Sequence, residues 1–305
     1  MPWTRRGLGN RIDKTPERVC DVSERNLRVT IPTDTVLEGG GFPVRRPSPM
    51  SSLASPFLLL DEMGPVDWPP GGAIGAPAHP HRGFETVTYL MQGRMMHGDS
   101  AGNMGDLGPG DVQWMTAGRG VIHEELPHPD FKRDGGIMHG FQIWVNLLAK
   151  DKMMEPRYQD VPSSQIPEAA SEDGLVSAKV IAGSCLGTEA VIDTMIPITL
   201  IHMRIQPGGA IEQAIEGGLN GMVYCFGGEV SIAGERTVRD GQLGLLSDGG
   251  SVALSVPAEA GETAEMLVLA GPEIDEPIAR YGPFVMNTEE EIRQAMTDYQ
   301  TGSLA

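Results

Sequence analysis

The chain has 305 residues, 40 glycines, 24 prolines and a formal net charge of −18. This length corresponds to about two domains of one to two hundred residues each. The acidic charge argues against direct binding to nucleic acid, which depends on a basic surface. Because the glycines and prolines follow no collagen-like period, they indicate tight turns between short strands, and therefore an all-β fold of barrels or sandwiches.

Nothing in the sequence indicates a membrane protein. No run reaches the roughly 18 apolar residues that a membrane span needs, and the N-terminus lacks the form of a signal peptide, so we expect a cytoplasmic protein. The cysteines Cys20, Cys185 and Cys225 are odd in number, far apart and outside any CxxC pattern. We expect reduced thiols, none of them a nucleophile.

The N-terminal part of the chain is expected to lead into a first barrel. Residues 1–25 are polar and interrupted by proline and glycine, so they form a lead-in without readable chemistry. A strand pattern begins at Leu27, and an apolar strand follows at 56–62. Residues 64–78 are rich in proline and glycine, so we predict a loop that brings the chain to His79 and forms part of a pocket rim.

Two segments carry side chains that can bind a metal. The sequence HPHRGFE starts at His79, and the sequence GRGVIHEE ends at Glu125. Side chains alternate between the two faces of a strand, so His79 and His81 point the same way. For the same reason His123 and Glu125 share a face, and Glu124 points away. Two such strands predict three imidazoles and one carboxylate around a single cation.

The residue types favour a first-row transition metal. Imidazole prefers Fe, Cu, Ni, Zn, Co or Mn to Ca and Mg, and a single carboxylate leaves the ion with positive charge and open coordination positions. Structural zinc sites usually recruit cysteine, which is absent from this region. A lone HxH pair is more often an ordinary pair of core residues. Two pairs, each in a strand that follows a glycine-rich or proline-rich turn, favour the metal site.

The rest of the first barrel and the connection that follows it are less informative. His97 lies between two strands, and we interpret it as a solvent-exposed loop histidine rather than a group that supports the ligands. Residues 140–148 alternate cleanly, so one side of that strand faces the core. Residues 151–174 contain prolines and a cluster of acids, which predicts a polar linker between domains.

A second barrel is predicted from about residue 175. Strand-like runs separated by glycine-rich turns suggest an internal repeat of the first barrel, but the segment 210–214 that corresponds to HPH contains no histidine. His202 is expected to be structural. Near the C-terminus, Thr288 followed by Glu291 forms a capping box and predicts a terminal helix within residues 286–305. An apolar stripe supports this helix and consists of Ile292, Ala295, Met296 and Tyr299.

Several segments resemble known cupin sequences. His79, His81 and Glu85 fit the first cupin motif, and the segments 79–89, 110–120, 142–147 and 282–287 resemble the pirin family, a family of bicupins. The resemblance extends from about residue 30 to the C-terminus. It implies two tandem cupin jelly-roll barrels with a short C-terminal helix.

The resemblance divides the chain into a metal-binding N-terminal cupin domain at 26–150 and a C-terminal cupin domain at 175–285 without metal ligands. It also implies an iron site made of His79, His81, His123 and Glu125. Cu, Ni, Mn, Co and Zn remain alternatives, because such ligand sets accept several metals. Glu85 shares the parity of His79 and His81, and we place it next to the ligands as a hydrogen-bonding group.

The activity implied by the resemblance is that of a quercetin 2,3-dioxygenase, which opens a flavonol with molecular oxygen. In that reaction Glu125 would act as general base as well as metal ligand. Two other functions stay open. One is a metal-dependent regulatory protein that acts through protein partners, and the other is a different cupin reaction on an unknown metabolite.

Overall fold

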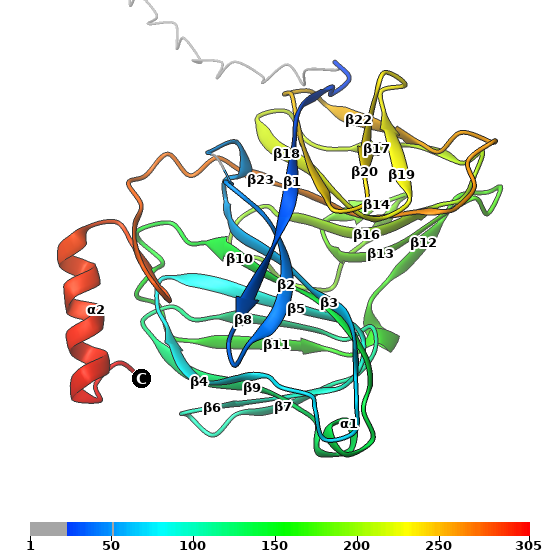
Figure 1. Ribbon diagram of the computed structural model, residues 1–305. Helices are drawn as coiled ribbons and strands as arrows, with labels where there is room; N and C mark the ends of the chain where they lie inside the picture. The colour runs from blue at the N-terminus through cyan, green and yellow to red at the C-terminus, as the bar shows by residue number, and fades with distance from the viewer. Residues whose placement is uncertain (1–22, 51) are drawn as a thin grey trace, which may run out of the picture.

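The computed structural model describes residues 23–50 and 52–305, and this part of the chain is nearly all β. Figure 1 shows two barrels, one above the other, with the C-terminal helix against the side of the lower barrel. The expected bicupin architecture is therefore confirmed. Most of the lead-in predicted at 1–25, and Cys20, lie outside the described residues.

The N-terminal barrel consists of two facing sheets, ordered β11-β8-β5-β10-β3-β2-β1 and β4-β9-β6-β7. Buried and more exposed side chains alternate in β9, whereas β5 and β8 are buried on both faces. Its elements are β1 (Leu27–Glu38), β2 (Phe42–Pro47), η1 (Ser52–Ala54), β3 (Phe57–Trp68), β4 (Ala76–His81), β5 (Phe84–Gln92), β6 (Met95–Asp99), β7 (Met104–Leu107), β8 (Val112–Thr116), β9 (Val121–Pro127), α1 (Pro129–Asp134), β10 (Gly136–Asn146) and β11 (Arg157–Val161).

The C-terminal barrel repeats this plan with shorter strands, and the chain ends in a hairpin and a helix. Its elements are η2 (Ser163–Gln165), β12 (Glu168–Ala170), β13 (Val176–Ala182), β14 (Ser184–Cys185), β15 (Thr188–Glu189), β16 (Thr199–Ile205), β17 (Ala210–Ala214), β18 (Leu219–Gly227), β19 (Glu229–Ile232), β20 (Arg236–Arg239), β21 (Gln242–Leu246), β22 (Ser251–Ser255) and β23 (Ala264–Pro272). The terminal elements are β24 (Ala279–Tyr281), β25 (Phe284–Met286) and α2 (Glu289–Thr301).

The two barrels are joined more closely than a linker would join them. The start of β1 pairs with β21 of the second barrel and its end pairs with β2 of the first, so one sheet runs through both. On one face of this sheet, aromatic side chains of both barrels pack into one core, and the rings of Phe141 and Phe226 lie 4.9 Å apart. The second barrel thus packs against strands of the first barrel, such as β10, that also contribute residues to the site.

The segment predicted as a polar linker, 151–174, contains two strands. β11 pairs with β8 of the first barrel, and β12 pairs with β13 of the second. Both are edge strands, β11 is polar and β12 is only three residues long, so neither showed a clear strand pattern in the sequence. The loop predicted at 64–78 is likewise shorter, because β3 continues to Trp68 and β4 begins at Ala76.

The C-terminal helix forms as its start signals indicate. The side chain of Thr288 accepts a hydrogen bond from the Glu291 backbone, and the Glu291 side chain accepts one from the Thr288 backbone. The helix packs against the first barrel through Ile292 and Ala295, which belong to a small apolar cluster with Phe284. No helix in the described part of the chain is long and apolar enough to span a membrane.

Both described cysteines are free and buried, as expected of packed thiols. Burial raises the pKa of Cys185 to about 11 and that of Cys225 to about 12. The thiolate that a nucleophile requires is therefore scarce near neutral pH.

Candidate metal centre

Three histidines converge between β4 and β9. The strands are antiparallel, and their register places His79 directly opposite His123, with His81 two residues further along β4. One ring nitrogen from each of these histidines lies within 4.8 Å of the others. In the described residues this is the group of histidine, cysteine and acidic side chains whose geometry can hold a metal ion.

The hydrogen bonds of His79 indicate which nitrogen is free to bind. Its Nδ1 lies 2.8 Å from the carbonyl oxygen of Pro77. A carbonyl oxygen only accepts, so Nδ1 carries the proton and donates it. The lone pair is then on Nε2, which lies 3.0 Å from Nε2 of His123. The backbone before His79 therefore fixes the tautomer in which Nε2 can bind a metal, an arrangement that is common at metal sites.

The other two imidazoles are buried and held neutral. Burial, followed by the neighbouring histidines, places the pKa of His81 and that of His123 well below the usual value. Neutral imidazole is the form that binds metals, because the lone pair must be free. The buried Nδ1 of His81 has no hydrogen-bond partner among the described residues. An orphaned buried nitrogen and two facing lone pairs fit a cation in this place.

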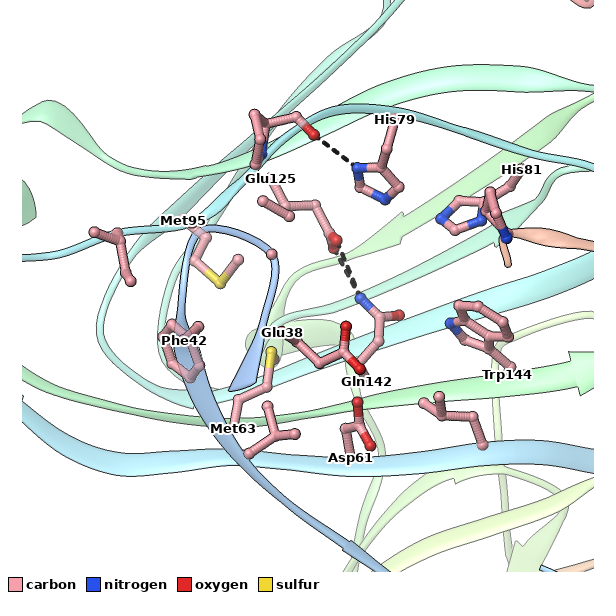
Figure 2. Close-up of a pocket in the computed structure, with 18 of the residues that line it drawn as sticks. Glu38, Phe42, Asp61, Met63, His79, His81, Met95, Glu125, Gln142 and Trp144 are labelled. Atoms are coloured by element: carbon pink, nitrogen blue, oxygen red, sulfur yellow. Dashed lines mark hydrogen bonds between the residues drawn. The ribbon is translucent and has the colours of Figure 1, made fainter. Parts of the chain in front are cut away.

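Glu125 lies beside the histidines and is held in position from two sides. It follows His123 by two residues in β9 and is almost fully buried. Thr88 Oγ1 donates to its Oε1 at 2.9 Å, and Gln142 Nε2 lies 3.0 and 3.2 Å from its two oxygens. Glu125 is not part of the group formed by the three histidines, whose ligand atoms lie within 4.8 Å of one another. Figure 2 shows its carboxylate facing the same cavity as His79 and His81.

Glu85 lies elsewhere, although its parity predicted a place next to the ligands. Thr116 Oγ1 donates to its carboxylate at 2.6 Å, and burial raises its pKa. The alternation that begins at His79 is interrupted by Gly83, whose φ of +91° separates β4 from β5. In β5, Thr88 faces the site, while Glu85 has the parity of Tyr89, which packs in the core between the barrels.

The interpretation of His97 as an exposed loop histidine is wrong. It lies in β6 and is 3% exposed, and its Nε2 lies 2.9 Å from Nδ1 of His123. The alternating burial of Met95, His97 and their neighbours in β6 is a strand signal. The sequence hid it, because β6 is short and contains Gly98 and Asp99, which are typical of turns.

A cavity of about 510 Å³ opens in front of the histidines. This volume suits a small organic molecule. Its apolar lining includes Phe42 and Met63 on one side and Trp144 on the other (Figure 2). The residues 74–78 form another part of its lining, in agreement with the predicted rim.

A charged wall completes the cavity. Arg46 donates to Asp61 at 2.5 Å and to Glu38 at 2.6 Å, so its charge is neutralised. Arg280 comes from β24 and lies over the ring of Trp144, 4.7 Å from its centre. The C-terminal hairpin thus contributes to a cavity whose candidate metal-binding residues all come from the first barrel.

Comparison with known proteins agrees with this geometry. The Pirin family model matches residues 42–145, and the model described as the Pirin C-terminal cupin domain matches residues 200–305. The chain belongs to the pirin family. Human pirin is 38% identical over 285 residues, covering 91% of this chain and 93% of its own. A pirin-like protein of Solanum lycopersicum is 41% identical and covers 87% of this chain and 88% of its own.

Solved structures give the same result. The crystal structure of a quercetin 2,3-dioxygenase from Acinetobacter baumannii aligns with a TM-score of 0.87 and 34% identity. The alignment covers 93% of this pirin and 99% of that chain. Oxalate decarboxylase from Lactobacillus farciminis aligns with a TM-score of 0.53 at 13% identity, which reflects the shared cupin fold alone.

The second barrel of this pirin has no counterpart of the histidine cluster among the described residues. In β17, Ile211 and Gln213 point inward where β4 presents histidines. His202 lies between the barrels, where its Nδ1 is 2.7 Å from the hydroxyl of Tyr89 and its Nε2 is 2.8 Å from Glu265. Both ring nitrogens are engaged, in agreement with a structural histidine.

Proposed function

We propose that this pirin is a metal-dependent dioxygenase of the quercetin 2,3-dioxygenase type, which opens a flavonol with molecular oxygen. One observation supports the proposal: three imidazoles converge beside a buried carboxylate, and two of them, His79 and His81, line a cavity of substrate size. The similarity to a solved quercetin 2,3-dioxygenase supports the choice of reaction.

His79, His81 and His123 would hold the metal, with Glu125 as a fourth ligand. We propose iron, and Cu, Ni, Mn, Co and Zn are the alternatives that such a ligand set accepts. When bound, the ion supplies a positive charge that favours ionisation of a neighbouring hydroxyl, and it supplies the redox chemistry that oxygen requires. The other steps belong to the side chains of this chain.

Glu125 is the proposed general base. A flavonol reacts as its 3-oxyanion, so the proton of the 3-hydroxyl must leave first. Thr88 and Gln142 orient the carboxylate that accepts this proton. The flavonol then takes up both atoms of one oxygen molecule, releases carbon monoxide and leaves a depside, which balances all atoms.

The apolar part of the cavity lining suits the substrate that we propose. Phe42, Met63 and Trp144 offer flat or adaptable apolar surface to a planar aromatic ring system. Arg280, stacked on Trp144 at the edge of the cavity, presents hydrogen-bond donors where phenolic hydroxyls of a bound flavonol can reach them.

The test is oxygen uptake and carbon monoxide release by the metal-loaded protein with quercetin. The proposal predicts both in equal amounts, and predicts that His123→Ala abolishes both. A wild-type protein that retains its metal but consumes no oxygen with flavonols would contradict the dioxygenase. That outcome favours a regulatory protein or another cupin reaction, which a metal-dependent pull-down of partners would separate.

A further inference from the structure

His97 contacts His123 through the ring nitrogen that does not face His79. Nε2 of His123 points at His79, and Nδ1 of His123 lies 2.9 Å from Nε2 of His97. His97 itself lies opposite Glu125 in the pairing of β6 with β9, so it belongs to the strand next to the proposed ligands.

The contacts determine where the protons lie. For Nε2 of His123 to offer a lone pair, its Nδ1 must carry the proton, since neutral imidazole has only one. That proton can only be donated to Nε2 of His97, which must then accept. His97 therefore has to be neutral, with its own proton on Nδ1.

His97 is in turn held by its surroundings. Its ring lies 5.0 Å from that of His123 and 5.2 Å from that of Tyr158. Tyr158 belongs to β11, the edge strand in the segment between the barrels. The ring of His97 is thus packed between β9 and β11 and cannot turn away from His123 without disturbing both neighbours.

We propose that His97 is a positioning residue for the metal. By accepting the Nδ1 proton of His123, it holds that imidazole in the tautomer and orientation in which Nε2 binds the ion. It does for His123 what the Pro77 carbonyl does for His79. The inference rests on the proposed metal-dependent function. Removing such an outer partner typically weakens metal binding by about 10- to 100-fold.

The test compares two substitutions at this position in the full chain, with Co(II) as the probe. His97→Leu fills the space but accepts no hydrogen bond, whereas His97→Gln can place an amide oxygen near the position of Nε2. The dissociation constant for Co(II), from competition with a chelator, and the visible spectrum of the bound ion are measured for each variant. His128→Leu serves as a control, because His128 caps α1 and does not line the cavity.

We expect His97→Leu to weaken Co(II) binding by about 10- to 100-fold and to change the spectrum, with His97→Gln close to the wild type. Urea unfolding of the metal-free variants reports damage to the fold. Wild-type affinity in His97→Leu would overturn the role of His97. The role of His97 would also be overturned if His97→Leu and His97→Gln lost the same Co(II) affinity and this loss followed a lower stability of the metal-free variants. A wild type that binds no Co(II) would contradict the proposed function itself.

Discussion

At the scale of single residues, the site depends on which way neighbouring side chains of β9 point. His123 and Glu125 face the barrel interior, and Glu124 between them is exposed. The carboxylate of Glu125 accepts hydrogen bonds from Thr88 and Gln142, whereas Glu124 lies on the outer face. Glu124 can therefore serve as the control when the role of the Glu125 carboxylate is tested.

Glu125→Gln keeps the size of the side chain but removes the base. We expect turnover of quercetin to fall by about 10²- to 10⁴-fold, the usual contribution of a positioned general base. Glu124→Gln removes the same charge from the outer face and should leave turnover unchanged. Metal content is measured in both variants. Equal turnover in wild type and Glu125→Gln, with full metal content, would contradict the role of Glu125.

Strand parity predicted the directions of His79, His81 and His123 from the sequence, and the structure brings these three together. The same rule placed Glu85 next to them, and there it failed. Parity holds only within a continuous strand, and Gly83 ends one strand and allows the next to start in a different phase. A glycine is compatible with many conformations, so the sequence alone could not reveal the break.

At the scale of elements, the turn between β4 and β5 packs tightly against the C-terminal hairpin. The fully buried Lys152 donates to the carbonyl oxygens of Gly83 and Val285, at 2.6 and 3.0 Å. A Cβ built on Gly83 would lie 2.0 Å from the Val285 oxygen. Because His81 precedes Gly83 by two residues, its position depends on a hairpin about 200 residues further along the chain.

Comparing Gly83→Ala with Gly102→Ala separates the effect of this contact on stability from the cost of the backbone conformation. Gly83 and Gly102 both have positive φ, at +91° and +87°, but a Cβ on Gly102 meets no atom within 4 Å. Each alanine should cost about 1–2 kcal/mol for the left-handed conformation. The clash with the Val285 oxygen should lower the free energy of unfolding of Gly83→Ala by about 2 kcal/mol more.

Urea unfolding and Co(II) affinity would be measured for both glycine variants. We expect metal binding to weaken in Gly83→Ala only, because the clash with Val285 shifts the turn that directly follows His81. If both variants lose the same stability and neither loses affinity, the hairpin does not support the metal site.

At the scale of the whole molecule, the two barrels should unfold together. Phe141 is fully buried in the core that both barrels share, and β1 pairs with both sheets. The described tryptophans, Trp68, Trp114 and Trp144, all lie in the first barrel. The fluorescence change of these three tryptophans therefore follows the first barrel, while far-UV circular dichroism follows both barrels. The fourth tryptophan, Trp3, lies outside the described residues.

Phe141→Ala should lower the free energy of unfolding by about 3–5 kcal/mol, because it leaves a cavity in the shared core. The fluorescence and circular dichroism transitions should coincide in both wild type and variant. Two separate transitions in the wild type would show that the barrels are independent, and the second barrel would then not support the site.

The sequence could predict two barrels but not how they are joined. Each barrel has its own turns and alternating strands, which are local features. The pairing of Leu27 with Leu246 joins residues 219 positions apart, and no local pattern encodes such a contact. The same holds for the position of Arg280 over Trp144. Contacts between distant strands are set by the packing of the whole chain, which a single sequence does not display.

Metal removal tests the site through the stability of the whole protein. An ion that binds only the folded state at 100 times its dissociation constant stabilises it by about 2.7 kcal/mol. We expect this gain in wild type on adding Co(II), measured by thermal unfolding, and its loss in His81→Ala. An equal gain in both would mean that the ion binds elsewhere.

We propose that one ion binds between His79, His81 and His123. Anomalous diffraction from crystals of the protein purified with its own metal, recorded at the absorption edge of that metal, tests it most directly. We predict one peak per chain, about 2.0–2.2 Å from a nitrogen of each histidine. A bound metal whose only peak lies away from these three side chains would contradict the account.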